Sequence, residues 1–255
     1  MQQPPIDQPE IDARIRDHED ELLRLWSAEQ GGATKDRDLQ IVSSAIPFPR
    51  DRSLRAIDLC SGPGDLGRAI RQVYPNAQID FIDRDPLLLS ICRGYNRHAG
   101  VPGTYWQLDL KDESWAEALG IARYDVIAVA NAIHWLSAVR AEAVFSDIYR
   151  LLDEGGTFFF AEPATPEGLF SRGFAGWKAR QPPRYEHRNW KAFWDLANSL
   201  VGYDHTELLG SRSAGRIGDE MTVRGWIDLA ETSQFQAVDV LWRDADVVII
   251  AAWKA

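Results

Sequence analysis

The residues of this chain that could do chemistry are carboxylates beside a glycine-rich turn and a histidine that follows an apolar run. The stretch IDLCSGPGDLG covers residues 57–67 and places Asp58 directly before a turn with three glycines. Large cofactors commonly sit on such turns, because glycine lets the backbone approach a ligand closely. The later stretch VANAIHWL carries His134, whose neutral imidazole is available near pH 7. The turn indicates a bound cofactor, and the histidine is a candidate for moving a proton.

The elements that must position these residues alternate between short apolar runs and helical patterns. Strands are expected at 54–60, 78–82, 104–108, 124–130 and 157–161. Helices are expected between them at 65–74, 86–98, 114–119 and 137–152. This rhythm predicts a parallel sheet with helices on both faces, whose ligands bind at the carboxyl ends of the strands.

The rest of the chain departs from this rhythm. Helices are expected at 11–29, 36–45 and 221–231, and two β-runs at 235–242 and 247–253 read as an antiparallel hairpin. The predicted fold is therefore a doubly wound α/β protein with a mostly parallel, seven-stranded, Rossmann-like sheet, a C-terminal hairpin and a helical lid insertion. The expected divisions are a helical cap at 1–50, a binding core at 51–162, a lid and acceptor-binding insertion at 163–220, and a last helix and hairpin at 221–255.

Composition limits the classes of partner. The formal net charge of −10 argues against nucleic acid, which is bound by clustered positive charge. The sequence predicts a cytoplasmic protein with no membrane partner. It has only two cysteines and no signal-peptide pattern, and its longest apolar run, at 247–253, is too short to span a membrane. Residues with metal-ligand spacing are not found, so no metal is expected. The N-terminal helices could cap the cofactor, with Trp26 packing inward, or form the surface of a homodimer.

Two cofactor classes fit the glycine-rich turn. Gly62, Gly64 and Gly67 match the dinucleotide pattern G-x-G-x-x-G, and Asp83 ends the next strand, 19 positions after Gly64 (83 − 64). However, Asp58 would lie near the pyrophosphate of a dinucleotide, where a carboxylate is unfavourable. S-adenosylmethionine instead carries a cationic amino group and a sulfonium, which a carboxylate attracts.

Two further features favour S-adenosylmethionine. Asp109, in QLDL after the third strand, can accept a hydrogen bond from an adenine amino group. The terminal hairpin is not expected of a dinucleotide-binding half-sheet. With FIDRDP, VANAIHWL and RLLDEGGTFFFAEP in order, residues 54–162 resemble the class I S-adenosylmethionine-dependent methyltransferase family, and the hairpin resembles it in architecture.

The resemblance implies S-adenosylmethionine as cofactor and methyl transfer to a small molecule, at an oxygen, nitrogen or carbon atom. In the family, the glycine loop holds the methionine end, the acid after strand two holds the ribose, and the acid after strand three faces the adenine. The implied cofactor-binding residues are Asp58, Cys60, Gly62, Gly64, Asp83, Arg84, Asp109, Leu110 and Asn131. Many members carry glycine at the position of Cys60, which is a departure here.

Methyl transfer needs donor and acceptor held in line, and a base is optional. The candidate catalytic residues are His134, then Glu162, then Tyr185 and His187. The candidate acceptor-binding residues are His134, Trp135, Trp177, Arg184 and Arg188. The two arginines could hold an anionic acceptor or belong to a solvated helix face, and His134 with Trp135 could simply wall the pocket.

Two other functions stay open from the sequence. One is an NAD(P)-dependent oxidoreductase. The other is a protein of the same fold that binds S-adenosylmethionine without transferring its methyl group.

Overall fold

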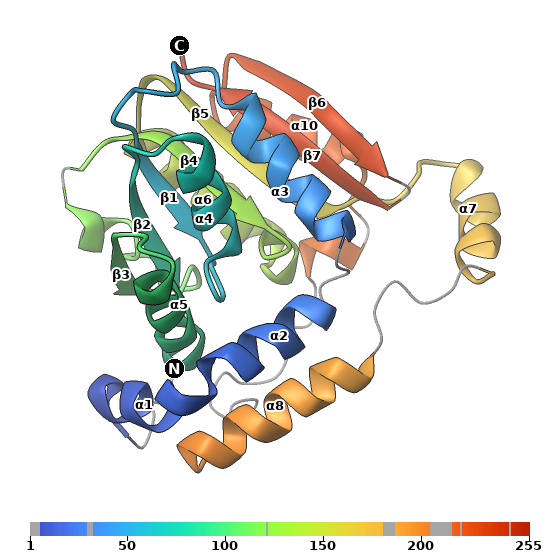
Figure 1. The fold of residues 1–255 in the computed structure, drawn as a ribbon. Coiled ribbons are helices and arrows are strands. Elements are labelled where there is room, and N and C mark those ends of the chain that lie inside the picture. Colours follow the sequence, from blue (N-terminus) through green and yellow to red (C-terminus); the bar gives the residue numbers. More distant parts are fainter. Residues whose placement is uncertain are drawn as a thin grey trace.

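The computed structural model describes residues 6–29, 33–120, 122–180, 187–204, 216–219, 221–244 and 246–255. Its centre is a seven-stranded sheet in the order β3-β2-β1-β4-β5-β7-β6 (Figure 1). The strands are β1 (Arg55–Leu59), β2 (Gln78–Asp83), β3 (Gly103–Gln107), β4 (Tyr124–Ala130), β5 (Leu152–Pro163), β6 (Ala237–Asp244) and β7 (Val247–Trp253). The first five are mutually parallel, and β7 pairs antiparallel with both β5 and β6. The predicted fold class and terminal hairpin are confirmed.

The central strands are buried because their sequences are apolar on both faces. β4 has the sequence YDVIAVA, which is apolar apart from Asp125 and Tyr124, and all of its residues except the last are buried. A parallel strand covered by helices on both sides reads as such a continuous run. β6 lies at the edge of the sheet, and its positions are exposed or half-buried. The core therefore centres on β1, β4 and β5, whose carboxyl ends carry the candidate site residues.

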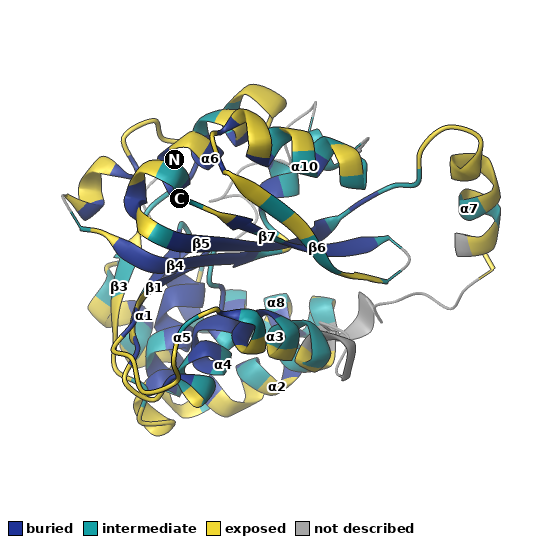
Figure 2. Cartoon of the chain, turned by 90° about the horizontal axis from the view of Figure 1, so that it is seen from above, coloured by how far each residue is buried: buried dark blue, intermediate teal, exposed yellow. Residues whose placement is uncertain are grey.

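Helices cover both faces of the sheet, as Figure 2 shows. One face carries α6 (Ala138–Leu151) and α10 (Val223–Thr232), and the other carries α3 (Ala33–Ala45), α4 (Asp65–Val73) and α5 (Pro86–His98). Ser137 is the N-cap of α6, because its hydroxyl accepts a hydrogen bond from the Arg140 N–H at 3.3 Å.

Two expected elements of the core differ in the structure. The expected helix at 114–119 is only a 3₁₀ turn, η2 (Glu117–Leu119). The expected strand at 157–161 is longer in the structure, because β5 already begins at Leu152. Gly155 has a φ of 78° and donates its N–H to the Lys254 carbonyl at 2.8 Å. Residues 153–156 bulge out of the pairing with β4, in which Leu152 pairs with Tyr124 and Thr157 with Val126.

The expected single helix at 11–29 is wrong in one respect: it is broken into three pieces. They are α1 (Gln8–Ile15), a 3₁₀ turn η1 (Arg16–His18) and α2 (Glu19–Glu29). The break carries neither glycine nor proline. It falls where the buried side chain of Glu19 lies against Gly94 of α5 and pairs with Arg97 and His98. The break therefore coincides with a tertiary contact of the residue that begins α2.

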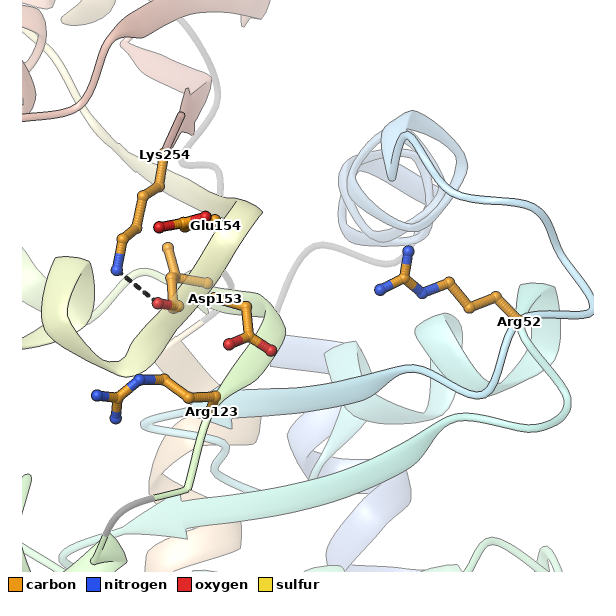
Figure 3. Close-up of a pocket in the computed structure, with 6 residues that line it drawn as sticks. Arg52, Arg123, Asp153, Glu154 and Lys254 are labelled. Atoms are coloured by element: carbon orange, nitrogen blue, oxygen red, sulfur yellow. Dashed lines mark hydrogen bonds between the residues drawn. The ribbon is translucent and has the colours of Figure 1, made fainter.

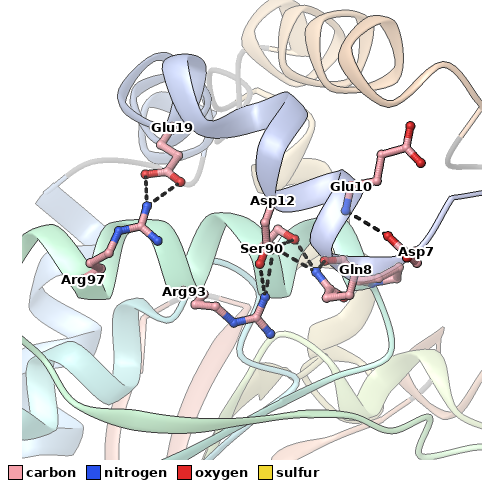
Figure 4. A network of polar contacts seen from close by, with 9 residues as sticks. Asp7, Gln8, Glu10, Asp12, Glu19, Ser90, Arg93 and Arg97 are labelled. Atoms are coloured by element: carbon pink, nitrogen blue, oxygen red, sulfur yellow. Dashed lines mark hydrogen bonds and ion pairs between the residues drawn. The ribbon is translucent and has the colours of Figure 1, made fainter.

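The N-terminal helices share a hydrophobic core with a helix from the expected insertion. α8 (His187–Val201) packs on α1 and α2, and α1 and α2 pack on α5. The buried members of this shared core are Ile11, Ile15, Leu22, Leu25, Leu87, Leu88, Ile91, Phe193, Ala197 and Val201. We call α1, α2 and α8 the helical cap. Polar contacts also hold it to α5, including both Asp12 carboxylate oxygens on the Arg93 guanidinium at 2.8–2.9 Å (Figure 4).

α7 (Phe170–Lys178) stands apart from the body of the molecule in both Figure 1 and Figure 2. Its first turn is strongly exposed: Phe170 is 80% exposed, and Leu169 directly before it is 85% exposed. Phe174 and Trp177 lie together on this helix with ring centroids 5.3 Å apart.

Candidate active site

The glycine-rich turn between β1 and α4 uses backbone conformations that favour glycine. Gly62 has a φ of 50° and Gly64 a φ of 84°. A Cβ on Gly64 would come within 3.0 Å of the Cys92 Sγ, so this position needs glycine for space as well as for conformation. Cys60 also has a positive φ of 54°. The departure from the family pattern therefore leaves the backbone in the conformation that a glycine would adopt.

Asp58 lies near the end of β1 and is buried at 2% exposure. Its Oδ2 accepts a hydrogen bond from the Gly67 N–H at 2.8 Å, in the first turn of α4. Burial raises the pKa of Asp58 to about 8, and the nearby carboxylates of Asp65 and Asp83 add to the rise, while the Gly67 N–H and the Arg68 guanidinium oppose it. Asp58 therefore caps the helix and also holds a carboxylate that a positively charged ligand would stabilise.

Asp83 ends β2 on the other side of the same turn. Its Oδ2 accepts from the Gly62 N–H at 2.8 Å and its Oδ1 from the Asp85 N–H at 2.9 Å. Burial and the neighbouring Asp85 raise the pKa of Asp83 to about 6, against the effect of these two N–H groups. The structure thus brings Asp58, Asp83 and the glycine turn together, as the sequence pattern predicts.

Asp109 follows β3 beside Arg84. Their closest atoms, Asp109 Oδ2 and Arg84 Nη1, are 3.8 Å apart, and Asp109 Oδ1 accepts from the Lys111 N–H at 2.9 Å. Leu110 is buried, and its carbonyl accepts a hydrogen bond from the Arg140 guanidinium. Asp109 and Leu110 therefore lie at the carboxyl end of β3, next to the carboxyl end of β2.

His134 and Glu162 form a pair at the carboxyl ends of β4 and β5. His134 Nδ1 lies 2.6 Å from Glu162 Oε2, and Glu162 Oε1 accepts from the N–H groups of Ala132 and Ile133 at 3.0 and 2.8 Å. Glu162 is fully buried, while the His134 side chain is 15% exposed. Asn131 bends the chain here with a φ of 56°. The first two candidate catalytic residues, His134 and Glu162, are therefore hydrogen-bonded to each other.

The helical cap reaches the glycine-rich turn through Trp26. A Cβ on Gly62 would lie 3.2 Å from the Trp26 ring, so the indole covers this glycine. The same indole packs on Trp190 and Phe193 of α8, with ring centroids 5.3 and 5.2 Å away. The expectation that Trp26 packs inward agrees with this contact.

The short segment Arg216–Asp219, which no sequence motif singled out, lies against His134. A Cβ on Gly218 would come within 3.0 Å of the His134 Cβ. The Arg216 guanidinium lies 4.6 Å from the centroid of the Trp135 ring, which in turn lies 4.8 Å from the His134 ring. Nothing in the sequence around Arg216 and Gly218 predicts these contacts, because the contacts arise from tertiary packing.

Several predicted residues are not gathered at this site. Trp177 lies on α7, away from the body of the molecule, so its predicted place at the acceptor is not seen here. Tyr185 and Arg184 fall outside the described residues. His187 and Arg188 begin α8, but their side chains are also outside the described part of the chain.

A hollow of about 470 Å³ lies at the amino ends of the parallel strands, at the opposite end of the sheet from the glycine-rich turn (Figure 3). Its lining comes from residues at the starts of the parallel strands and the end of β7: Arg52, Arg123, Leu152, Asp153, Glu154 and Lys254. Lys254 donates hydrogen bonds to the carbonyls of Tyr149 and Leu152 at 3.0 and 2.6 Å. This hollow is separate from the glycine turn and the His134–Glu162 pair, which lie at the carboxyl edge.

Metal clusters and membrane spans are both absent from the described part of the chain. No group of three or more His, Cys, Asp or Glu side chains there is arranged to hold a metal ion. No helix among the same residues is long and apolar enough to cross a membrane.

The sheet and its carboxyl edge define a class of protein. A dinucleotide-binding sheet has the order 3-2-1-4-5-6, whereas here the antiparallel β7 lies between β5 and β6. Residues 56–156 match the family described as "Methyltransferase domain". The parallel core of this chain, at residues 56–156, is therefore similar to a methyltransferase domain.

Solved structures share this fold. An O-methyltransferase family protein from Burkholderia thailandensis is 14% identical with a TM-score of 0.58, over 87% of this chain and 56% of its own. Human N-acetylserotonin methyltransferase, solved with S-adenosylmethionine, is 15% identical with a TM-score of 0.55, over 94% and 58%. The CurJ carbon methyltransferase is 18% identical with a TM-score of 0.57, over 85% and 54%. The chain spans a little over half the length of these proteins, and at such identities the likeness concerns the fold.

Proposed function

We propose that this chain transfers the methyl group of S-adenosylmethionine to a small-molecule acceptor, with His134 as the base. The observation that carries the proposal is the His134–Glu162 pair at the carboxyl edge, next to the glycine turn. A dyad of this kind is what proton removal from an acceptor requires, because the carboxylate orients the imidazole and stabilises its charged form.

The residues of the turn fit the cofactor. Asp58 is a buried carboxyl group whose pKa is raised to about 8, and a cationic ligand beside it would favour its ionised form. Asp83 is a second buried carboxyl group at the same turn, with a pKa raised to about 6. When bound, the cofactor supplies a methyl group on a positively charged sulfur. We assign Asp58 and the glycine turn to its methionine end, Asp83 with Arg84 to the ribose, and Asp109 with Leu110 to the adenine.

His134 would act through its Nε2 atom. Because Glu162 Oε2 accepts the hydrogen on Nδ1, the neutral imidazole keeps its lone pair on Nε2. When the acceptor takes the methyl group, the sulfur–methyl bond would break and S-adenosylhomocysteine would leave. The proton of the acceptor hydroxyl, amine or acidic carbon would then pass to Nε2. The resulting imidazolium is then stabilised by the Glu162 carboxylate, which the Ala132 and Ile133 N–H groups hold in place.

The neighbouring structures are described as O-methyltransferases in some cases and as a carbon methyltransferase in another. The fold therefore does not decide whether the acceptor atom is oxygen or carbon. An anionic acceptor held by Arg184 or Arg188 stays a prediction of the sequence. Single substitutions of these arginines by Met test it, and unchanged acceptor affinity would reject it.

The experiment for the function as a whole is a search for turnover. The purified chain is incubated with methyl-labelled S-adenosylmethionine and a panel of phenols, amines and carboxylated aromatics. Labelled product and S-adenosylhomocysteine should form in equal amounts. Cofactor binding with no labelled product from any acceptor would favour the alternative of a protein that binds the cofactor without methyl transfer.

A further inference from the structure

We infer that Gly218 is a positioning residue for His134, and that the segment Arg216–Asp219 clamps the base against Glu162. This inference rests on the proposed role of His134 as the base. It concerns the end of the predicted insertion at 163–220, just before α10, which the sequence motifs do not reach.

The clamp is made of three contacts between two short 3₁₀ turns, η3 (Ile133–Trp135) and η4 (Ile217–Asp219), and the residues beside them. The Ile217 N–H donates to the Leu136 carbonyl at 2.8 Å. Ser137 and Arg216 form an antiparallel bridge, and the Arg216 guanidinium lies over the Trp135 ring. These contacts hold the two turns together next to Gly218.

Gly218 sits where these turns approach each other closely. A Cβ there would come within 3.0 Å of the His134 Cβ, and would lie 3.1 and 3.2 Å from the His134 carbonyl oxygen and Cα. These atoms belong to the backbone and the first side-chain carbon, so they cannot move without moving the imidazole. Gly218 has an ordinary φ, so glycine is needed here for space and not for conformation.

Glu162 is fixed from the other side. Its Oε1 holds the Ala132 and Ile133 N–H groups, and its Oε2 holds His134 Nδ1. His134 thus lies between a buried carboxylate and a glycine backbone. An added methyl group at residue 218 must displace η3 or η4, and a base displaced by about 1 Å can lose about 100-fold in rate.

The test replaces Gly218 by Ala in the full chain and follows the His134 Nδ1 proton by NMR with nitrogen-labelled histidine. The chain has only five histidines, and the His134 signal is assigned by its loss in His134→Asn. In the wild type this proton should resonate far downfield because of its short hydrogen bond to Glu162. In Gly218→Ala it should move upfield or vanish by exchange, and kcat should fall about 10- to 100-fold. The dissociation constant of S-adenosylhomocysteine should stay close to that of the wild type.

Gly225→Ala is the matched control. Its added Cβ would lie 2.9 Å from the Met221 Sδ, the mobile part of a flexible side chain that can rotate away. The His134 signal and kcat should both be retained. If Gly218→Ala does not fold, Arg216→Gln removes the cation from the Trp135 ring without adding a clash, and a smaller shift of the same signal is expected.

A folded Gly218→Ala protein with the wild-type His134 signal would overturn the inference. If the wild type shows the downfield signal but transfers no methyl group to any acceptor, the proposed function fails while the clamp is still tested by the NMR comparison.

Discussion

His134 and Glu162 are joined by a hydrogen bond of 2.6 Å across the ends of two neighbouring parallel strands, although 28 residues separate them in the chain. The register of the sheet explains the meeting, because Ala130 of β4 pairs with Ala161 of β5. The residue after Ala161 therefore lies beside the chain that leaves β4. The pair is a product of the strand order and would be lost by a one-residue slip of β5.

Replacing Glu162 by Gln should lower kcat by about 10²- to 10⁴-fold. The Gln oxygen can still accept from the Ala132 and Ile133 N–H groups, but its amide would donate towards His134 Nδ1. That reverses the tautomer and removes the lone pair from Nε2. Steady-state rates with a confirmed acceptor give kcat, and titration calorimetry should show nearly unchanged binding of S-adenosylhomocysteine.

Glu154→Gln is the control for this change, because Glu154 lies on the same strand at the opposite edge and is exposed. Its kcat should match the wild type. A Glu162→Gln enzyme with wild-type kcat would show that no proton passes through His134.

Asp58→Asn should stabilise the ligand-free protein above about pH 7 and weaken cofactor binding. The folded pKa of Asp58 is about 8, above its ordinary 3.8, so the folded state binds a proton more tightly than the unfolded chain. This contribution to stability is complete below about pH 4 and is lost as the pH rises through about 8. The asparagine side chain carries no charge to desolvate, so the variant should lose less stability over that range.

Thermal unfolding between pH 5 and pH 9 checks this, with the exposed Asp239→Asn as the charge-matched control. In the wild type, S-adenosylhomocysteine should bind more tightly as the pH rises towards 8, because its cationic amino group favours the ionised carboxylate. In Asp58→Asn the affinity should be about 10- to 100-fold lower and depend less on pH. Equal affinities in both proteins would leave Asp58 as a helix cap only.

Gly64→Ala should destabilise the fold more than Gly100→Ala. Both glycines have positive φ, 84° and 66°, so both alanines carry the cost of left-handed backbone, about 1–2 kcal/mol. Only the Gly64 Cβ would also collide with Cys92, whereas nothing lies within 4 Å of a Cβ on Gly100. Overpacking adds about 1–3 kcal/mol. Urea unfolding of the two variants measures the difference, and equal losses would contradict the tight packing beneath the turn.

Glu19→Gln should loosen the helical cap. Glu19 is 3% exposed and accepts hydrogen bonds from Arg97 at 3.1 and 3.3 Å, with His98 Nε2 3.1 Å away (the Arg97 contact appears in Figure 4). Because Arg97 and His98 are themselves more than half exposed, the expected loss is about 1–2 kcal/mol. Hydrogen exchange should quicken in α1 and α2 and stay unchanged in β4. The exposed Glu21→Gln should have no such effect, and equal exchange in both variants would argue against a docking role for Glu19.

The elements that could be predicted from the sequence are those whose signal is local. The continuous apolar run 247–253 matches β7 residue for residue, and the acids of β1 and β2 lie at the turn as expected. These acids could be selected as site candidates because ligands of parallel α/β sheets bind at the carboxyl ends of the strands, which all lie at the same end of the sheet.

The contacts that could not be predicted join segments far apart in the chain. Trp26 on Gly62, Gly218 on His134 and the break of the first helix at Glu19 each depend on a partner that no periodicity specifies. The pairing of His134 with Glu162 is similar, since it needed the strand register as well as the two residue types. Local pattern therefore defined the sheet and its edge, and tertiary packing defined the geometry of the base.

Thermal unfolding of the full chain with S-adenosylhomocysteine, S-adenosylmethionine, NAD and NADP in parallel tests the central claim most directly. A ligand at 100 times its dissociation constant should stabilise the folded state by about 2.7 kcal/mol. We predict that the two adenosyl ligands stabilise the wild type and that Asp58→Asn weakens the effect. Stabilisation by NAD or NADP alone would contradict the account and would show that the glycine-rich turn binds a dinucleotide.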